Sequence, residues 1–93
     1  MKMARTIGSV TLSKAHPAMA GAKLRCVEVV ESIEQIDTFP LGGETVVAWD
    51  LCGTGIGDLV AIAEGPEAAQ PFRPDVKPID ASIVALLDEV DLD

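Results

Sequence analysis

Three glycines alternate with other residues in Gly53-Thr54-Gly55-Ile56-Gly57, where the spacing comes nearest to a ligand-binding motif. Glycine-rich loops bind phosphate when their main-chain amides lead into a helix N-terminus. Here the spacing is G-x-G-x-G instead of G-x-G-x-x-G, no Lys-Ser or Lys-Thr pair follows, and the next segment has a strand-like pattern. The sequence therefore disfavours nucleotide binding and favours a structural or interface turn.

Two carboxylates, Asp50 and Asp58, lie on either side of this stretch. Paired carboxylates can carry out acid–base catalysis, but they need a nucleophile or base within reach, and the sequence places none beside them. Short acidic side chains next to glycine turns commonly accept hydrogen bonds from loop amides. We expect this second role for both residues.

The single histidine and the two cysteines are the other candidates for chemistry. His16 precedes Pro17, which favours an extended backbone, and no partner for a catalytic base is nearby, so a surface position is expected. Cys26 and Cys52 are far apart, without a C-x-x-C motif, and are expected to be buried, reduced thiols. The sequence thus predicts no catalytic residue, no metal site, no cofactor and no enzymatic activity.

The glycine stretch is flanked by apolar runs at 45–51 and 59–63, which are rich in β-branched residues and are typical of buried strands. Two strands joined by a glycine-rich turn would form a hairpin with an exposed tip. A further strand is expected at 4–13, with a bulge or bend at Gly8. Another is expected at 23–32, irregular near Cys26-Val27.

The connecting segments are short and rich in turn residues. A loop is expected at 14–20 and a turn-rich connection at 33–43, and 64–69 has the pattern of a turn followed by one short helical turn. Three prolines in 70–78 indicate an extended surface segment. The pattern at 79–90 fits a helix or a buried strand equally well.

Chain length and element pattern together indicate one all-β domain. A chain of 93 residues is long enough for a single core, and short strands without a long helix are typical of a small barrel or sandwich. Aromatic side chains are few, at 3% of residues, so the core must consist mainly of aliphatic side chains. Small domains of this kind often gain stability by forming oligomers.

The formal charge is −8, from 15 acidic and 7 basic residues. Such a balance disfavours nucleic acid and anionic membrane surfaces as partners, because both are bound through clustered Lys and Arg. The N-terminal residues have no signal-peptide pattern, and no apolar run approaches the roughly 20 residues that span a bilayer. A cytosolic protein is expected, with an acidic, solvated C-terminal end at 89–93.

The order and spacing of several short motifs resemble those of the EutN/CcmL family, the pentameric vertex proteins of bacterial microcompartment shells. The matching residues cover most of the chain: Ala4-x-x-Ile7-Gly8-Ser9-Val10, Gly21-Ala22-Lys23-Leu24, Val47-Ala48-x-Asp50-x-x-Gly53-x-Gly55-x-Gly57-Asp58-x-Val60, Gly65, and Pro78-Ile79-Asp80-x-x-Ile83-Val84. The resemblance implies a five-stranded, OB-like β-barrel over about residues 4–88, in which the segment at 79–90 contains the last strand.

The resemblance also implies an assembly and a role. These are a cyclic homopentamer with a small central pore, a place at the five-fold corners of a shell built from hexameric and trimeric facet proteins, and no catalysis. We take residues 53–57 as the hypothetical pore or subunit interface, with Thr54 facing the pore. The alternative that the residues leave open is an OB-like ligand- or nucleic-acid-binding module.

This chain departs from the family pattern at three places. The arginine that commonly follows the Gly65 turn is missing, because the chain continues as Gly65-Pro66-Glu67-Ala68-Ala69. Thr54 stands where the family has alanine, and Ala85 stands where it has glycine. None of these changes conflicts with the barrel.

Overall fold

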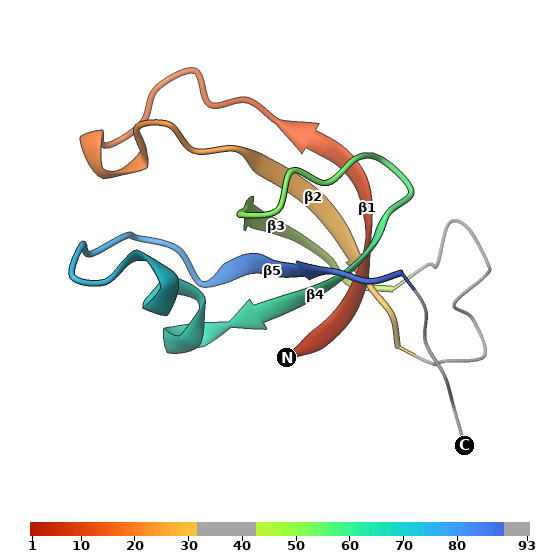
Figure 1. Ribbon diagram of the computed structural model, residues 1–93. Helices are drawn as coiled ribbons and strands as arrows, with labels where there is room; N and C mark the ends of the chain where they lie inside the picture. The colour runs from red at the N-terminus through yellow and green to blue at the C-terminus, as the bar shows by residue number, and fades with distance from the viewer. Residues whose placement is uncertain (32–42, 89–93) are drawn as a thin grey trace.

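The computed structural model describes residues 1–31 and 43–88, and five strands in these ranges form a closed barrel (Figure 1). The prediction of a small five-stranded, OB-like barrel is confirmed, and so is a last strand within 79–90. The elements follow in the order β1 (Lys2–Val10), η1 (Pro17–Met19), β2 (Leu24–Val29), β3 (Thr45–Asp50), β4 (Leu59–Glu64), η3 (Gly65–Phe72) and β5 (Ala81–Leu86).

The strand order around the barrel is β1-β2-β3-β5-β4, and β4 closes the barrel against β1. Every neighbouring pair is antiparallel except β3 and β5, which are parallel. The predicted hairpin is therefore wrong, because β5 lies between β3 and β4. The link from Asp50 to Leu59 is longer than the 2–5 residues typical of hairpin loops, and it crosses one end of the barrel.

Two bulges bend the strands into this small barrel. In β1 the register with β2 shifts between Thr6 and Gly8, so that Ile7 is the extra residue. The predicted bulge at Gly8 is confirmed, and the expected irregularity of the second strand lies opposite it, at Cys26-Val27. In β5 the register with β4 shifts so that Val84 has no partner residue in β4. Bulges of this kind increase local twist, which a closed barrel requires.

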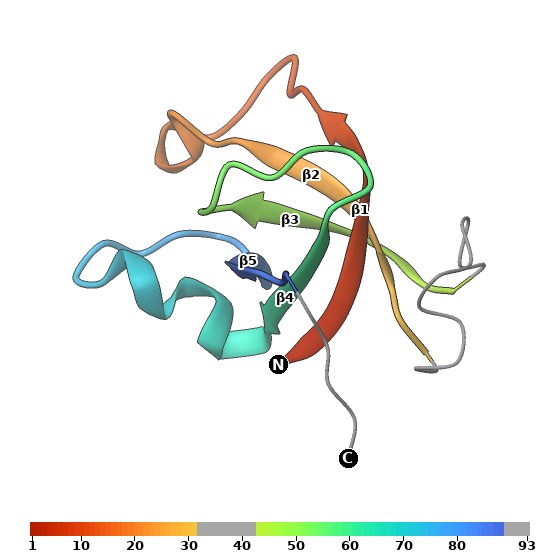
Figure 2. The same ribbon diagram turned by 45° about the vertical axis from the view of Figure 1, so that its right-hand side comes forward.

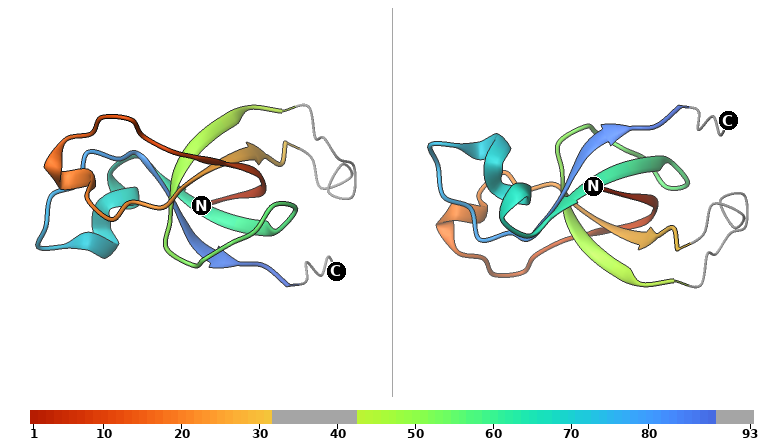
Figure 3. Two further views of the ribbon diagram at one scale, coloured as in Figure 1. Left: turned by 90° about the horizontal axis from the view of Figure 1, so that it is seen from above. Right: turned by 90° about the horizontal axis from the view of Figure 1, so that it is seen from below.

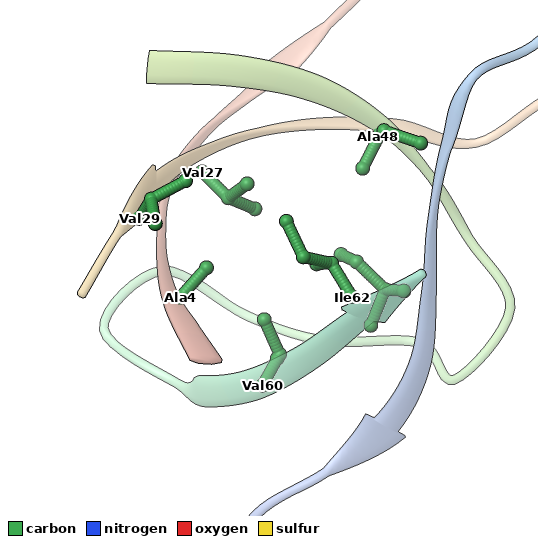
Figure 4. Close-up of a cluster of buried hydrophobic side chains, with 8 residues drawn as sticks. Ala4, Val27, Val29, Ala48, Val60 and Ile62 are labelled. Atoms are coloured by element: carbon green, nitrogen blue, oxygen red, sulfur yellow. The ribbon is translucent and has the colours of Figure 1, made fainter. Parts of the chain in front are cut away.

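The core lies inside the barrel and consists of small aliphatic side chains. Side chains from all five strands point toward the barrel axis (Figure 4). Val, Ala and Ile alternate with outward-facing residues along the strands, as the period of two requires. The buried cluster consists of Ala4, Val27, Val29, Ala48, Val60, Ile62, Ala81 and Ile83.

A second, smaller layer packs outside the barrel, against Trp49. The ring of Phe72 in η3 meets the Trp49 ring edge-on, with centroids 4.7 Å apart. Lys77 lies over the same indole and donates a hydrogen bond from Nζ to the main-chain oxygen of Ala18, at 2.9 Å. The segments containing η1 and η3 lie at the same end of the barrel, as the two views of Figure 3 show.

Three expectations about the connections need correction or fall outside the described residues. The segment at 70–78 is not extended throughout, because η3 continues to Phe72; its prolines exclude an α-helix but allow short 3₁₀ turns. The connection at 33–43 lies outside the described residues except for Gly43, and so does the acidic end at 89–93.

In the described ranges no helix has the length and apolar character needed to cross a membrane.

Candidate functional site

The residues singled out by their spacing lie in the glycine loop, which we define as residues 51–58. The loop leaves β3, crosses the end of the barrel and meets β1 before it enters β4 (Figure 2). Gly57 donates from its main-chain nitrogen to the Thr6 oxygen at 2.7 Å, and Thr6 donates in turn to the Asp58 oxygen at 2.9 Å. Nη1 of Arg5 donates to the Gly57 oxygen at 2.6 Å. The loop is thus fixed to the barrel and is not a free hairpin tip.

Asp50 organises the first half of the loop. Its Oδ1 accepts hydrogen bonds from the main-chain nitrogens of Cys52 and Gly53, both at 2.9 Å. Its Oδ2 accepts from the main-chain nitrogen of Thr54 at 2.7 Å and from the Thr54 hydroxyl at 3.1 Å. The predicted role of Asp50 as an acceptor for loop amides is confirmed. Asp58 has the same role, because its Oδ2 accepts from the Gly55 nitrogen at 2.8 Å.

A cation from the neighbouring strand completes the Asp50 network. Arg25, in β2, donates from Nε to Asp50 Oδ2 at 3.2 Å and to the Thr54 oxygen at 3.1 Å. The sequence pattern did not indicate a role for this residue. The available signal was a single arginine between buried positions of a predicted strand, but its partner lies 25 positions away in the sequence.

Thr54 points into the barrel and closes its end. The residue is 2% exposed, and its hydroxyl lies 3.3 Å from that of Thr6, in addition to its bond with Asp50. The hypothesis that the Thr54 side chain faces a pore does not fit this position. The exposed members of the loop core are Gly53, Gly55, Ile56 and Gly57, and Ile56 is 72% exposed.

The network lowers the pKa of Asp50 below its ordinary value of 3.8. Burial alone raises this pKa, since it disfavours the charged form. The hydrogen bonds from the amides of Cys52, Thr54 and Gly53 and from the Thr54 hydroxyl favour the carboxylate and outweigh burial.

Because the pKa of Asp50 is lowered in the folded protein, the stability of the barrel depends on pH. The stabilisation from Asp50 is complete above the pKa of the unfolded chain and is lost as the pH falls through the lower, folded pKa. We therefore expect the thermal midpoint to fall as the pH drops below about 3.8. Melting curves of the wild-type protein and of Asp50→Asn between about pH 6 and pH 2 should converge at the acid end. A constant difference across this range would contradict the prediction.

The remaining candidates for chemistry have structural surroundings. His16 is exposed, as predicted, and its Nδ1 accepts from the Ala18 nitrogen at 3.0 Å, which caps η1. Both cysteines are free thiols, but Cys26 is half-buried and Cys52 is exposed, so the expectation of buried thiols is wrong for Cys52. Cys52 is exposed because the chain turns out of β3 at Leu51. Partial burial and the Asp50 charge raise the pKa of its thiol, which reduces its reactivity.

Within residues 1–31 and 43–88, no group of three or more His, Cys, Asp or Glu side chains is arranged to hold a metal ion. The carboxylates of Asp50 and Asp58 both accept hydrogen bonds from loop amides, which is a structural role. What the site offers is a rigid loop with small, exposed residues. Such a surface is suited to close contact with another chain.

Comparison with known proteins gives the family. The family described as "Ethanolamine utilisation protein EutN/carboxysome" (EutN/CcmL) matches residues 1–88 of this chain. The bacterial microcompartment shell vertex protein PduN of Salmonella typhimurium is 32% identical, over 95% of this chain and 96% of its own length. The shell vertex protein EutN of the same organism is 31% identical, over 97% of this chain and 86% of its own length.

The fold also matches that of a solved shell protein. The GrpN pentameric microcompartment shell protein from Rhodospirillum rubrum superimposes with a TM-score of 0.81, at 28% identity and over 99% of both chains. Sequence and fold agree over nearly the whole length. The chain belongs to the EutN/CcmL family.

Proposed function

We propose that this protein is a structural component of a bacterial microcompartment shell, in which homopentamers close the five-fold vertices. The observation that carries the proposal is the likeness to a pentameric shell protein over 99% of both chains. Relatives that are named shell vertex proteins support the same role.

A vertex role requires shape and contact surfaces, not chemistry. Hexagonal units alone tile a flat sheet, and a closed polyhedron needs five-fold units at its corners. The rigid loop and the absence of a catalytic arrangement in the described residues agree with such a role. On this proposal the partners are other copies of the chain and the hexameric and trimeric facet proteins. The protein has no catalytic activity or cofactor, and its location is the shell of a cytoplasmic compartment.

We place residues 53–57 of the glycine loop, all exposed except Thr54, near the five-fold axis as the pore rim or subunit contact. Small residues allow five chains to approach closely there. The hydrogen bonds from Asp50 and Asp58 hold the loop in one conformation, which a narrow rim requires. Because Thr54 points inward, Ile56 is the side chain of these residues that projects most.

The first test is the native mass in solution. Five chains of 9.7 kDa predict a particle of about 48 kDa. We expect light scattering on a sizing column to give this mass at low and at high salt, because the chain's charge of −8 must lie away from the subunit contacts. A stable monomer at micromolar concentration would overturn the proposal.

The alternative, an OB-like module that binds nucleic acid, has less support. Such modules stack bases on exposed aromatic rings in a basic groove. Here Trp49 is buried against Phe72, and the chain is acidic. Salt-dependent binding of a single-stranded oligonucleotide would favour this alternative.

A further inference from the structure

The barrel has two open strand edges where β3 and β5 meet. These strands pair only at Trp49–Ser82 and Asp50–Ile83. Within the described residues, the first part of β3, Thr45–Ala48, therefore has a strand neighbour only in β2. The last part of β5, Val84–Leu86, likewise has one only in β4. The two edges lie on opposite sides of the short contact between the strands.

Neither open edge carries the usual protection. Exposed edges in natural proteins are commonly blocked by charged side chains or by proline. The segments Thr45–Ala48 and Val84–Leu86 contain neither, although charged residues are 24% of the chain. Instead they expose apolar side chains, with Val47 at 47% and Leu86 at 54% exposure. Edges of this composition are expected to be covered in the assembled protein.

The two edges differ in shape. Beside the β3 edge lies a groove of about 160 Å³, which is lined mainly by apolar residues, among them Met19, Val47 and Trp49, and also by Asp80. A cavity of about this size in a protein core accommodates a benzene ring, so it is large enough for a leucine side chain. At the β5 edge Leu86 projects, with Leu51 also exposed next to the strand. One edge therefore has a recess and the other a projection.

A second copy of the chain is the occupant that fits both edges. A cyclic ring with five subunits uses a heterologous interface, in which each copy contributes two different, complementary surfaces. A standard interface buries roughly 800 Å² per partner, so two flanks require roughly 1,600 Å² of the 5865 Å² accessible on the single chain. The two uncharged edges provide surfaces of this kind in an otherwise acidic chain.

We propose that the β5 edge of one subunit docks against the β3 edge of the next, with Leu86 seated in the groove beside Val47. This inference rests on the proposed pentamer and specifies its contact. Main-chain groups along the two edges extend the sheet from one barrel to the next, and the apolar side chains exclude water from the contact. The glycine loop begins at Leu51, beside the β5 edge, so the contact and the loop form one continuous surface.

The test compares single and paired charge substitutions. Val47→Glu and Leu86→Glu each place a charge in the proposed contact, and each should shift the measured mass from about 48 kDa toward 9.7 kDa. The paired variant Val47→Lys with Leu86→Glu places opposite charges in every contact of the ring and should restore the pentamer. Leu12→Glu, at an apolar residue with 44% exposure that belongs to neither edge segment, is the matched control and should remain pentameric.

The possible outcomes distinguish a failure of the proposed contact from a failure of the proposed function. A monomeric wild type would overturn the proposed function together with the contact. A pentameric wild type with pentameric single variants would overturn the contact alone. Single variants that dissociate without rescue in the paired variant would also overturn it, because the two residues would then not face each other. Circular dichroism confirms that each variant is folded, and Leu86→Gln replaces Leu86→Glu if the latter does not fold.

Discussion

Replacing Asp50 with alanine is expected to lower the free energy of unfolding by about 3–5 kcal/mol, because it removes a buried carboxylate that accepts several hydrogen bonds and pairs with the half-buried Arg25. The carboxylate is fully buried, with a side-chain exposure of 0%. Its loss leaves three loop amides, at Cys52, Gly53 and Thr54, without their acceptor. It also leaves Arg25 with the Thr54 oxygen as its remaining contact in this network.

Asp58→Ala is the matched control for this prediction. Asp58 contributes one hydrogen bond, to the Gly55 nitrogen in an exposed position, so its loss should cost at most about 1.5 kcal/mol. Asp50→Asn should resemble Asp50→Ala, because both carboxylate oxygens accept hydrogen bonds and an amide group would direct its NH₂ at other donors. Urea unfolding of the three variants gives the comparison. Equal losses for Asp50→Ala and Asp58→Ala would contradict the proposed importance of the Asp50 network.

The local sequence pattern predicted where strands lie along the chain, but it did not predict the order of the strands in the barrel. β-Branched residues at alternate positions located the first four strands approximately, and Gly8 indicated the bulge, because both signals arise within a few residues. The hairpin was wrong because β5, which follows β4 in the sequence, inserts between β3 and β4. Such a placement depends on contacts between distant segments, which no local period encodes.

The candidate site was predicted in part for the same reason. The roles of Asp50 and Asp58 follow from the chemistry of short acidic side chains next to glycine, which is local. The direction of Thr54 depends on Thr6 and Arg25, which approach it only when the barrel closes. The exposure of Cys52 depends on where the chain leaves β3. The resemblance to the family supplied what the pattern at 79–90 could not, namely the choice of a strand for Ala81–Leu86.

Replacing Gly55 with leucine is expected to break the pentamer and leave the barrel stable. The backbone of Gly55 is outside the left-handed region, and among the described residues an added Cβ would meet only Asp58 Oδ2, at an ordinary contact distance of 3.7 Å. Nothing in the described part of the chain therefore requires glycine at this position. If the loop lies near the five-fold axis, five leucine side chains would meet where five glycines fit. The mass should fall from about 48 kDa toward that of the monomer, while the melting temperature changes little.

Gly53→Ala distinguishes folding from assembly at the same loop. Gly53 has a φ of +72°, which an alanine adopts at a cost of about 1–2 kcal/mol, although no atom of residues 1–31 and 43–88 outside its chain neighbours lies within 4 Å of the added Cβ. This variant should melt at a lower temperature and yet retain the pentamer below that temperature, since a methyl group is small. Gly55→Leu should therefore lower the mass but not the melting temperature, whereas Gly53→Ala should lower the melting temperature but not the mass. A Gly55→Leu protein with the mass of the wild type would contradict the placement of the loop near the five-fold axis. The contact between β3 and β5 would then remain as the determinant of the ring.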